Sequence, residues 1–80
     1  MFFTNFIKTY NISIYNEEKH SGLLRHFYIR QGKNTGEIMI CVVINGTDLP
    51  QKNKLIEQLK TVLGDNLKSV ILNINTNKTN

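Results

Sequence analysis

Basic and aromatic side chains offer the clearest chemistry in this sequence, and they gather between residues 19 and 36. This segment contains no Asp or Glu, but it carries four positive charges, at Lys19, Arg25, Arg30 and Lys33. The whole chain of 80 residues has 10 Lys and Arg against 6 Asp and Glu, a net charge of +4. One segment therefore accounts for the entire net charge, and the rest of the chain is balanced.

Aromatic rings are interleaved with these charges, at His20, His26, Phe27 and Tyr28. Positive charge attracts phosphates, and flat rings stack on unpaired bases. The pattern predicts a hairpin that faces RNA. The candidate RNA-binding residues are Arg25, His26, Tyr28, Arg30 and Lys33. A solvated strand face without a partner is the alternative that composition leaves open.

Other chemistry finds little support in the sequence. Cys41 is the single cysteine and lies in the most apolar segment, where a thiol is desolvated and inert. His20, His26 and Cys41 do not have the spacing of zinc ligands. Glu17 and Glu18 are adjacent in a polar stretch, so they do not converge as an acid/base pair. We therefore predict no catalytic, cofactor-binding or metal-ligating residues in this chain.

Length and hydropathy narrow the class of protein further. A chain of this size forms one small domain, which buries somewhat above 60% of its unfolded surface. The longest apolar run, residues 38–44, is far shorter than the roughly 20 residues that span a membrane. The sequence shows no signal peptide, and a single cysteine closes no internal disulfide. A reducing, cytoplasmic setting without membrane contact is the expectation.

Two helices are predicted from apolar residues at helical spacing. The first covers residues 2–10, and Asn11 is suited to end it in the left-handed conformation. The second covers residues 50–63, with Pro50 in its first turn and Gly64 as its stop. The apolar positions are Phe2, Phe3, Phe6, Ile7 and Tyr10 in the first, and Leu55, Ile56, Leu59, Val62 and Leu63 in the second.

Three strands are predicted at residues 23–31, 37–45 and 67–75, the first two joined by a glycine-containing turn. The first strand alternates, with Phe27 and Ile29 on one side and His26, Tyr28 and Arg30 on the other. Strict alternation also directs Arg25 to the core side. The second strand is apolar on both faces, which indicates a central, covered position.

The third strand is expected to bury Val70, Leu72 and Ile74 and to leave Asn73 and Asn75 on its other face. Asparagine is disfavoured in strands, so Asn73 and Asn75 point either to specific hydrogen bonds or to a cap at the sheet edge. The resulting fold class is α+β, a small single domain with the order α-β-β-α-β. Its three-stranded sheet carries two helices on one face, like a ferredoxin-like unit that lacks its first strand.

Four motifs carry a family resemblance, in the order Tyr15-Asn16-Glu17, Gly22-Leu23-Leu24-Arg25-His26, Thr35-Gly36-Glu37-Ile38-Met39, and Asn73-Ile74-Asn75 with Thr79-Asn80. With them the chain resembles the central domain of bacterial RNA uracil-5-methyltransferases, especially the 23S ribosomal RNA enzymes. The resemblance covers nearly all of residues 1–80. Asn16 replaces the usual aspartate and Thr76 a common proline.

The resemblance implies a noncatalytic domain, excised from an enzyme that methylates uridine with S-adenosylmethionine. In the parent enzyme, other domains hold S-adenosylmethionine, the catalytic residues and, in many members, a four-cysteine iron–sulfur cluster. The implied partners are 23S rRNA and the sister domains, and the implied role is to hold RNA while one uridine is flipped out. Arg25, on the core side, would instead anchor the catalytic domain.

Two other roles stay open at this point. A structural spacer would contact only its sister domains through apolar or amide groups, and its hairpin charges would be dispensable. A free-standing small-ligand module ranks last, because it needs a concave pocket and the sequence offers no cluster of polar residues for one.

Overall fold

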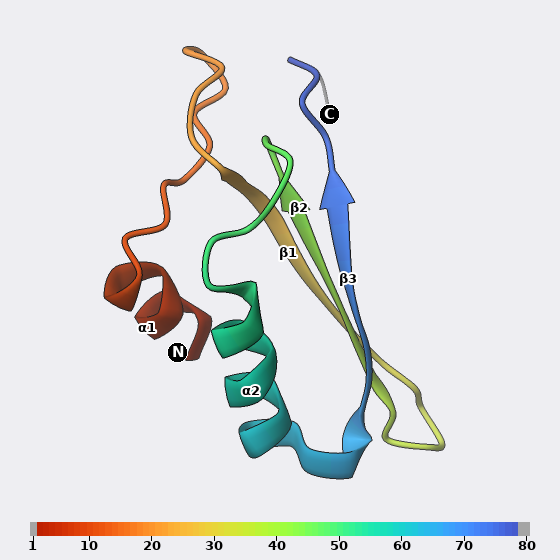
Figure 1. Ribbon diagram of the computed structural model, residues 1–80. Helices are drawn as coiled ribbons and strands as arrows, with labels where there is room; N and C mark the ends of the chain where they lie inside the picture. Colours follow the sequence, from red (N-terminus) through yellow and green to blue (C-terminus); the bar gives the residue numbers. More distant parts are fainter. Residues whose placement is uncertain (1, 79–80) are drawn as a thin grey trace.

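A computed structural model describes residues 2–78, with side chains from residue 4 onward (Figure 1). The elements follow the order α1 (Phe2–Thr9), β1 (Leu24–Gln31), β2 (Ile38–Ile44), α2 (Lys52–Leu63), a short 3-10 turn (Gly64–Asn66) and β3 (Leu67–Ile74). The predicted order α-β-β-α-β is thus confirmed. The expected packing of the Phe2 and Phe3 side chains, and the motif residues Thr79 and Asn80, lie outside the described residues.

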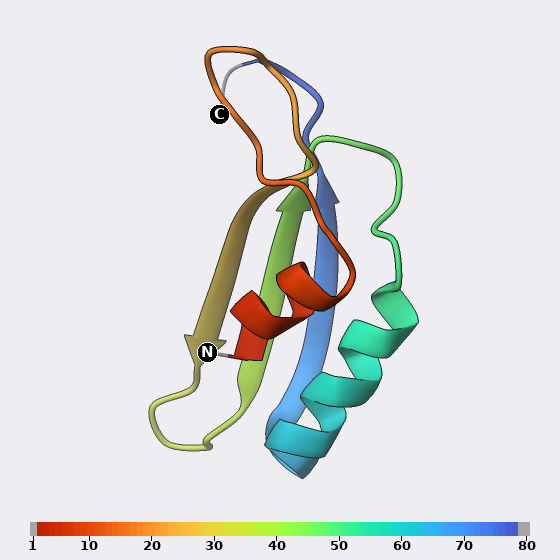
Figure 2. The same ribbon diagram turned by 90° about the vertical axis from the view of Figure 1, so that its left-hand side faces the viewer.

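The three strands form one mixed sheet with β2 in the centre. β1 and β2 pair antiparallel as a hairpin, whereas β2 and β3 pair parallel because α2 carries the chain back across the sheet. Both helices lie on the same face of the sheet (Figures 1 and 2). The predicted α+β class is therefore confirmed, and within residues 2–78 no helix lies on the other face of the sheet. In the described part of the chain, no helix is long and apolar enough to cross a membrane.

The core lies between the helices and the covered sheet face. Its best-buried side chains are Phe6, Ile40, Val42, Ile44 and Leu55. Three positions expected to be apolar and buried are outside this core. Ile29, Val62 and Ile74 are 63%, 64% and 51% exposed. Ile29 and Ile74 lie on the edge strands β1 and β3, and Val62 lies in the last turn of α2. Periodicity alone places these residues inside, because it does not show where the covering layer ends.

The ends of the helices follow backbone geometry. Asn11 adopts a positive φ of 53° two residues after the end of α1, as predicted for the residue that stops this helix. Gly64 has a φ of 58° and ends α2. Pro50 lies before α2 and not in its first turn, because Gln51 takes a left-handed conformation with φ 61° and reorients the chain at the helix start.

A β-bulge interrupts the alternation of β1 at Arg25. Leu24 pairs with Ile44, and His26 pairs with Val43, so Arg25 is an extra residue between two consecutive pairs. The bulge keeps Leu24 and Phe27 against the core, although they are three positions apart. The expectation that Arg25 points into the core is therefore wrong.

Candidate nucleic-acid interface

The sheet face without helices carries three of the five RNA-binding candidates. After the bulge, β1 alternates strictly, so His26, Tyr28 and Arg30 share this face and Phe27 points to the core. Tyr28 is 51% exposed, and its ring stacks on that of His26 with centroids 5.6 Å apart and an angle of 22° between the planes. The predicted grouping of these three side chains is confirmed.

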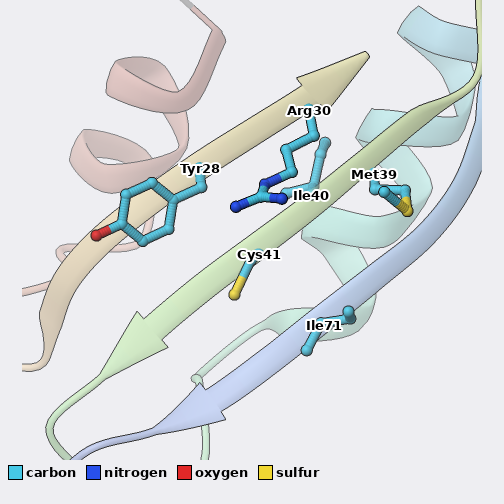
Figure 3. Close-up of a pocket in the computed structure, with 6 residues that line it drawn as sticks. All are labelled: Tyr28, Arg30, Met39, Ile40, Cys41 and Ile71. Atoms are coloured by element: carbon cyan, nitrogen blue, oxygen red, sulfur yellow. The ribbon is translucent and has the colours of Figure 1, made fainter. Parts of the chain in front are cut away.

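Apolar side chains from the other two strands extend this surface. Register places Cys41 opposite Tyr28 and Ile71 opposite Cys41. Figure 3 shows Cys41 between Tyr28 and Ile71, with Arg30 reaching over the sheet from β1. Together they enclose a shallow pocket of about 340 Å³, lined by Tyr28, Arg30, Met39, Ile40, Cys41 and Ile71. We call these six residues the sheet-face pocket.

Exposure of the pocket residues corrects the sequence interpretation of β2. Its two apolar faces predict cover on both sides, but Met39 is 46% exposed and Ile71 on the neighbouring strand is 53% exposed. Within residues 2–78 the helices cover only the opposite face. The open face therefore combines apolar and aromatic side chains with one guanidinium group.

Lys33 lies in the turn at the end of the β1–β2 hairpin. The Gly32 backbone N–H donates to the Glu37 carbonyl over 2.8 Å and closes this turn. Lys33 and Arg30 are both exposed, and the turn extends past one end of the sheet (Figure 1). Their two charges are thus available to a ligand that lies along the hairpin.

Arg25, the fifth candidate, lies at the opposite end of β1 and has a different environment. Its guanidinium group lies 3.9 Å from the centroid of the Tyr15 ring. The Nη1 atom donates to the backbone carbonyls of Asn75 and Asn77 over 3.2 and 2.5 Å. Tyr15 is held in turn by its hydroxyl, 2.7 Å from Nδ1 of His20. We call Tyr15, His20, Arg25, Asn75 and Asn77 the C-terminal clasp.

The charged segment is consequently not one patch. The loop before β1, which contains Lys19, and the first residues of β1, which include Arg25, lie at the end of the molecule that holds the clasp. The last residues of β1, which include Arg30, and the turn with Lys33 lie at the other end (Figure 1). Sequence reasoning missed Met39 and Ile71 as surface residues and Tyr15 as a partner of Arg25. The asparagines of the last strand were the one sequence signal for hydrogen bonds at this end of the sheet. Asn75 does cap the end of β3, since its Oδ1 accepts from the Asn77 backbone N–H over 3.2 Å.

Metal binding finds no site among the side chains that the structure describes. No group of three or more His, Cys, Asp and Glu side chains could hold a metal ion there. Cys41 is only half-buried and lines the sheet-face pocket beside Tyr28 and Ile71. The expectation of a desolvated cysteine inside the core is therefore wrong, because its side of β2 is not covered by the helices. A binding surface for an extended ligand is what the arrangement supports.

Comparison with known proteins adds an independent observation. The chain is 51% identical over 69 residues to an uncharacterized RNA methyltransferase of Caldanaerobacter subterraneus, which covers 86% of this chain and 15% of the relative. It is 47% identical over 66 residues to one of Halalkalibacterium halodurans, covering 82% of this chain and 14% of the relative. A third, from Clostridium tetani, is 43% identical over 74 residues, covering 92% and 16%.

No family model matches the chain. The chain spans about 14–16% of the length of these relatives, and the similarity covers 82–92% of the chain itself. The chain is therefore homologous to one segment of proteins that are named RNA methyltransferases.

Proposed function

We propose that this chain is the noncatalytic central domain of an S-adenosylmethionine-dependent RNA (uracil-5-)-methyltransferase. Its role is to hold folded ribosomal RNA, with 23S rRNA as the expected substrate, while the catalytic domain methylates a flipped uridine at C5. The open sheet face with its adjacent hairpin charges, in a chain homologous to a segment of RNA methyltransferases, is the observation that carries this proposal. Flipping a base costs a few kcal/mol, so the flanking backbone has to be held.

Arg30 and Lys33 are the residues that we assign to phosphate contacts. Both are exposed on the hairpin, and residues 19–36 contain no carboxylate to neutralise them. Arg25 is given a positioning role within the fold, because its guanidinium donates to two backbone carbonyls. We assign any four-cysteine iron–sulfur cluster of the parent enzyme to another of its domains, because this chain has a single cysteine and such clusters take four.

A titration of the 80-residue chain with a fluorescent 23S rRNA hairpin, at several salt concentrations, tests the proposal. We expect the logarithm of the binding constant to fall linearly with the logarithm of salt concentration, with a slope of about 0.7–0.9 per phosphate neutralised. Joint replacement Arg30→Ala and Lys33→Ala should weaken binding and reduce the slope by about 1.4–1.8. Joint replacement Lys54→Ala and Lys60→Ala removes the same charge from α2 and should leave the slope unchanged.

A spacer domain is the second candidate, and one observation favours it. Tyr28, Met39 and Ile71 expose large apolar surfaces side by side, as surfaces between packed domains do. The spacer role predicts no RNA binding even at low salt, and equal behaviour of the two double variants. Either result refutes the assignment of Arg30 and Lys33 to RNA.

A further inference from the structure

We propose that the sheet-face pocket is a subsite for one unpaired RNA base, which stacks on Tyr28. This inference rests on the proposed function and deepens it, because it assigns a base contact in addition to the phosphate contacts of Arg30 and Lys33. The pocket of about 340 Å³ lies at the lower end of the roughly 300–1,000 Å³ typical of ligand sites. It therefore suits a single flat ring system better than a larger ligand.

Tyr28 supplies the stacking surface. Half of this side chain is exposed on a face that no helix covers. The neighbouring His26 ring stacks against it, at a centroid distance of 5.6 Å, which restricts the rotamers of Tyr28 before a ligand arrives. A ring that is already ordered loses less conformational entropy on binding. Tyr28 thus resembles a preformed stacking platform.

The floor of the pocket is apolar and reaches across all three strands. Cys41 on β2 lies opposite Tyr28, and Ile71 on β3 lies opposite Cys41. A base that stacks on Tyr28 and extends across the sheet therefore contacts a thiol and an aliphatic side chain. Met39 borders the same floor with a flexible thioether. These groups form van der Waals contacts with any base, so the pocket accepts a base without reading its hydrogen-bonding edge.

Charge decides between RNA and protein as the occupant. Arg30 contributes a guanidinium to the pocket wall, and none of the six lining residues is acidic. A planar guanidinium on exposed surface pairs with phosphate and also stacks on bases. The adjacent turn adds Lys33. The pocket therefore combines an aromatic platform, an apolar floor and phosphate-binding charge, which is the combination that single-stranded nucleic acid requires.

The experiment uses Tyr28→Trp as a reporter, since the chain contains no other tryptophan. A short oligouridylate is the probe, and an abasic strand with the same number of phosphates is its matched ligand. We expect the oligouridylate to quench the fluorescence of Tyr28→Trp and the abasic strand to leave it unchanged. Val62→Trp is the control variant, because Val62 is exposed on α2, in the layer opposite the pocket. It should not be quenched by either strand.

Affinity measurements with the same two ligands compare the effect of a Tyr28 substitution on a strand with bases and on a strand without them. Tyr28→Ala should weaken oligouridylate binding about 5- to 150-fold, the range for loss of one base–aromatic stack. It should weaken abasic binding hardly at all, because that ligand has no base to lose. Equal losses on the two ligands would show a general effect of Tyr28 and overturn the subsite.

Failure of the subsite and failure of the proposed function give different results. If RNA binding depends on Arg30 and Lys33 but Tyr28→Trp is not quenched, the phosphate contacts stand and the base subsite is overturned. The open face is then left for contact with another domain. If neither strand binds at low salt, the proposed RNA contact itself is refuted, together with the subsite.

Discussion

Replacement of Arg25 by alanine should destabilise the fold strongly, although the residue is near the surface. The interactions removed by the substitution include two charge-assisted hydrogen bonds to backbone carbonyls and a contact with the Tyr15 ring. The bond to Asn75 is partly buried, whereas the bond to Asn77 is exposed and water replaces it. One charged hydrogen bond contributes about 1.5–3 kcal/mol and the cation–π contact about 0.5–1 kcal/mol. The expected loss in the free energy of unfolding is therefore about 2–4 kcal/mol.

Thermal and urea unfolding, followed by circular dichroism, measure this loss. For a domain of this size, a loss of about 2–4 kcal/mol lowers Tm by roughly 8–30 °C. Arg25→Lys keeps the charge but lacks the planar fork, so it should recover only a minor part of the loss. Tyr15→Phe keeps the ring and removes the hydroxyl that contacts His20, so it should cost less than Tyr15→Leu.

Arg30→Ala provides the matched control for Arg25→Ala. Both variants lose one guanidinium from the same strand, but Arg30 is exposed on the open face. Surface substitutions of this kind change stability by about 0.5 kcal/mol or less. If the two variants unfold at the same urea concentration, the contacts of Arg25 contribute nothing and the reasoning about the clasp is refuted.

Three further predictions concern other parts of the chain. Gly22→Ala should cost about 3 kcal/mol or more, because a Cβ there would lie 2.1 Å from the Ile14 carbonyl oxygen at a φ of +98°. Gly64→Ala should lower the urea midpoint less, because its Cβ would have open space and only the positive φ of 58° strains the backbone. Phe6→Ala should lower the free energy of unfolding by about 3–5 kcal/mol in the same assay, since Phe6 is fully buried between α1 and the sheet. A smaller loss than that of Gly64→Ala would contradict the assigned core. The hydrogen bond from Lys52 holds the pKa of Asp48 below its ordinary value of 3.8. The ionised Asp48 carboxylate therefore stabilises the fold at neutral pH, and this stabilisation is lost as the pH falls through the lowered pKa. The difference in urea midpoint between wild type and Asp48→Asn should vanish in strong acid, and an equal difference at neutral and acid pH would refute this role of Asp48.

Local patterns predicted the elements well, because their physical causes are local. Asn11 and Gly64 end the two helices through positive φ, a property that residue type favours directly. The alternation of His26, Tyr28 and Arg30 was visible for the same reason. Fold class and strand order follow from such signals, since few arrangements bury the apolar side of every element.

The features that the sequence did not reveal depend on distant or missing partners. The bulge at Arg25 arises because Leu24 and Phe27 both pack into the core, which period-two reasoning does not anticipate. The acceptors of Arg25 are backbone carbonyls. Every residue type has a backbone carbonyl, so the sequence does not show which residues accept these hydrogen bonds. A strand that is apolar on both sides, such as β2, indicates that both of its faces are favourably buried. It does not indicate whether the groups that bury each face belong to the same domain.

The C-terminal clasp also has a consequence for the kinetics of folding. The two hydrogen bonds of Arg25 in the clasp join residues that are separated by 50 and by 52 positions in the sequence. The β1–β2 hairpin, in contrast, closes a turn of a few residues. Contacts at long separation require closure of a long loop, so they form after local pairs and after β3 has docked. Arg25 is then expected to have a φ-value near zero, and its loss accelerates unfolding while the folding rate stays almost constant. The clasp thus governs how long the folded state persists, and the hairpin governs how quickly it is reached.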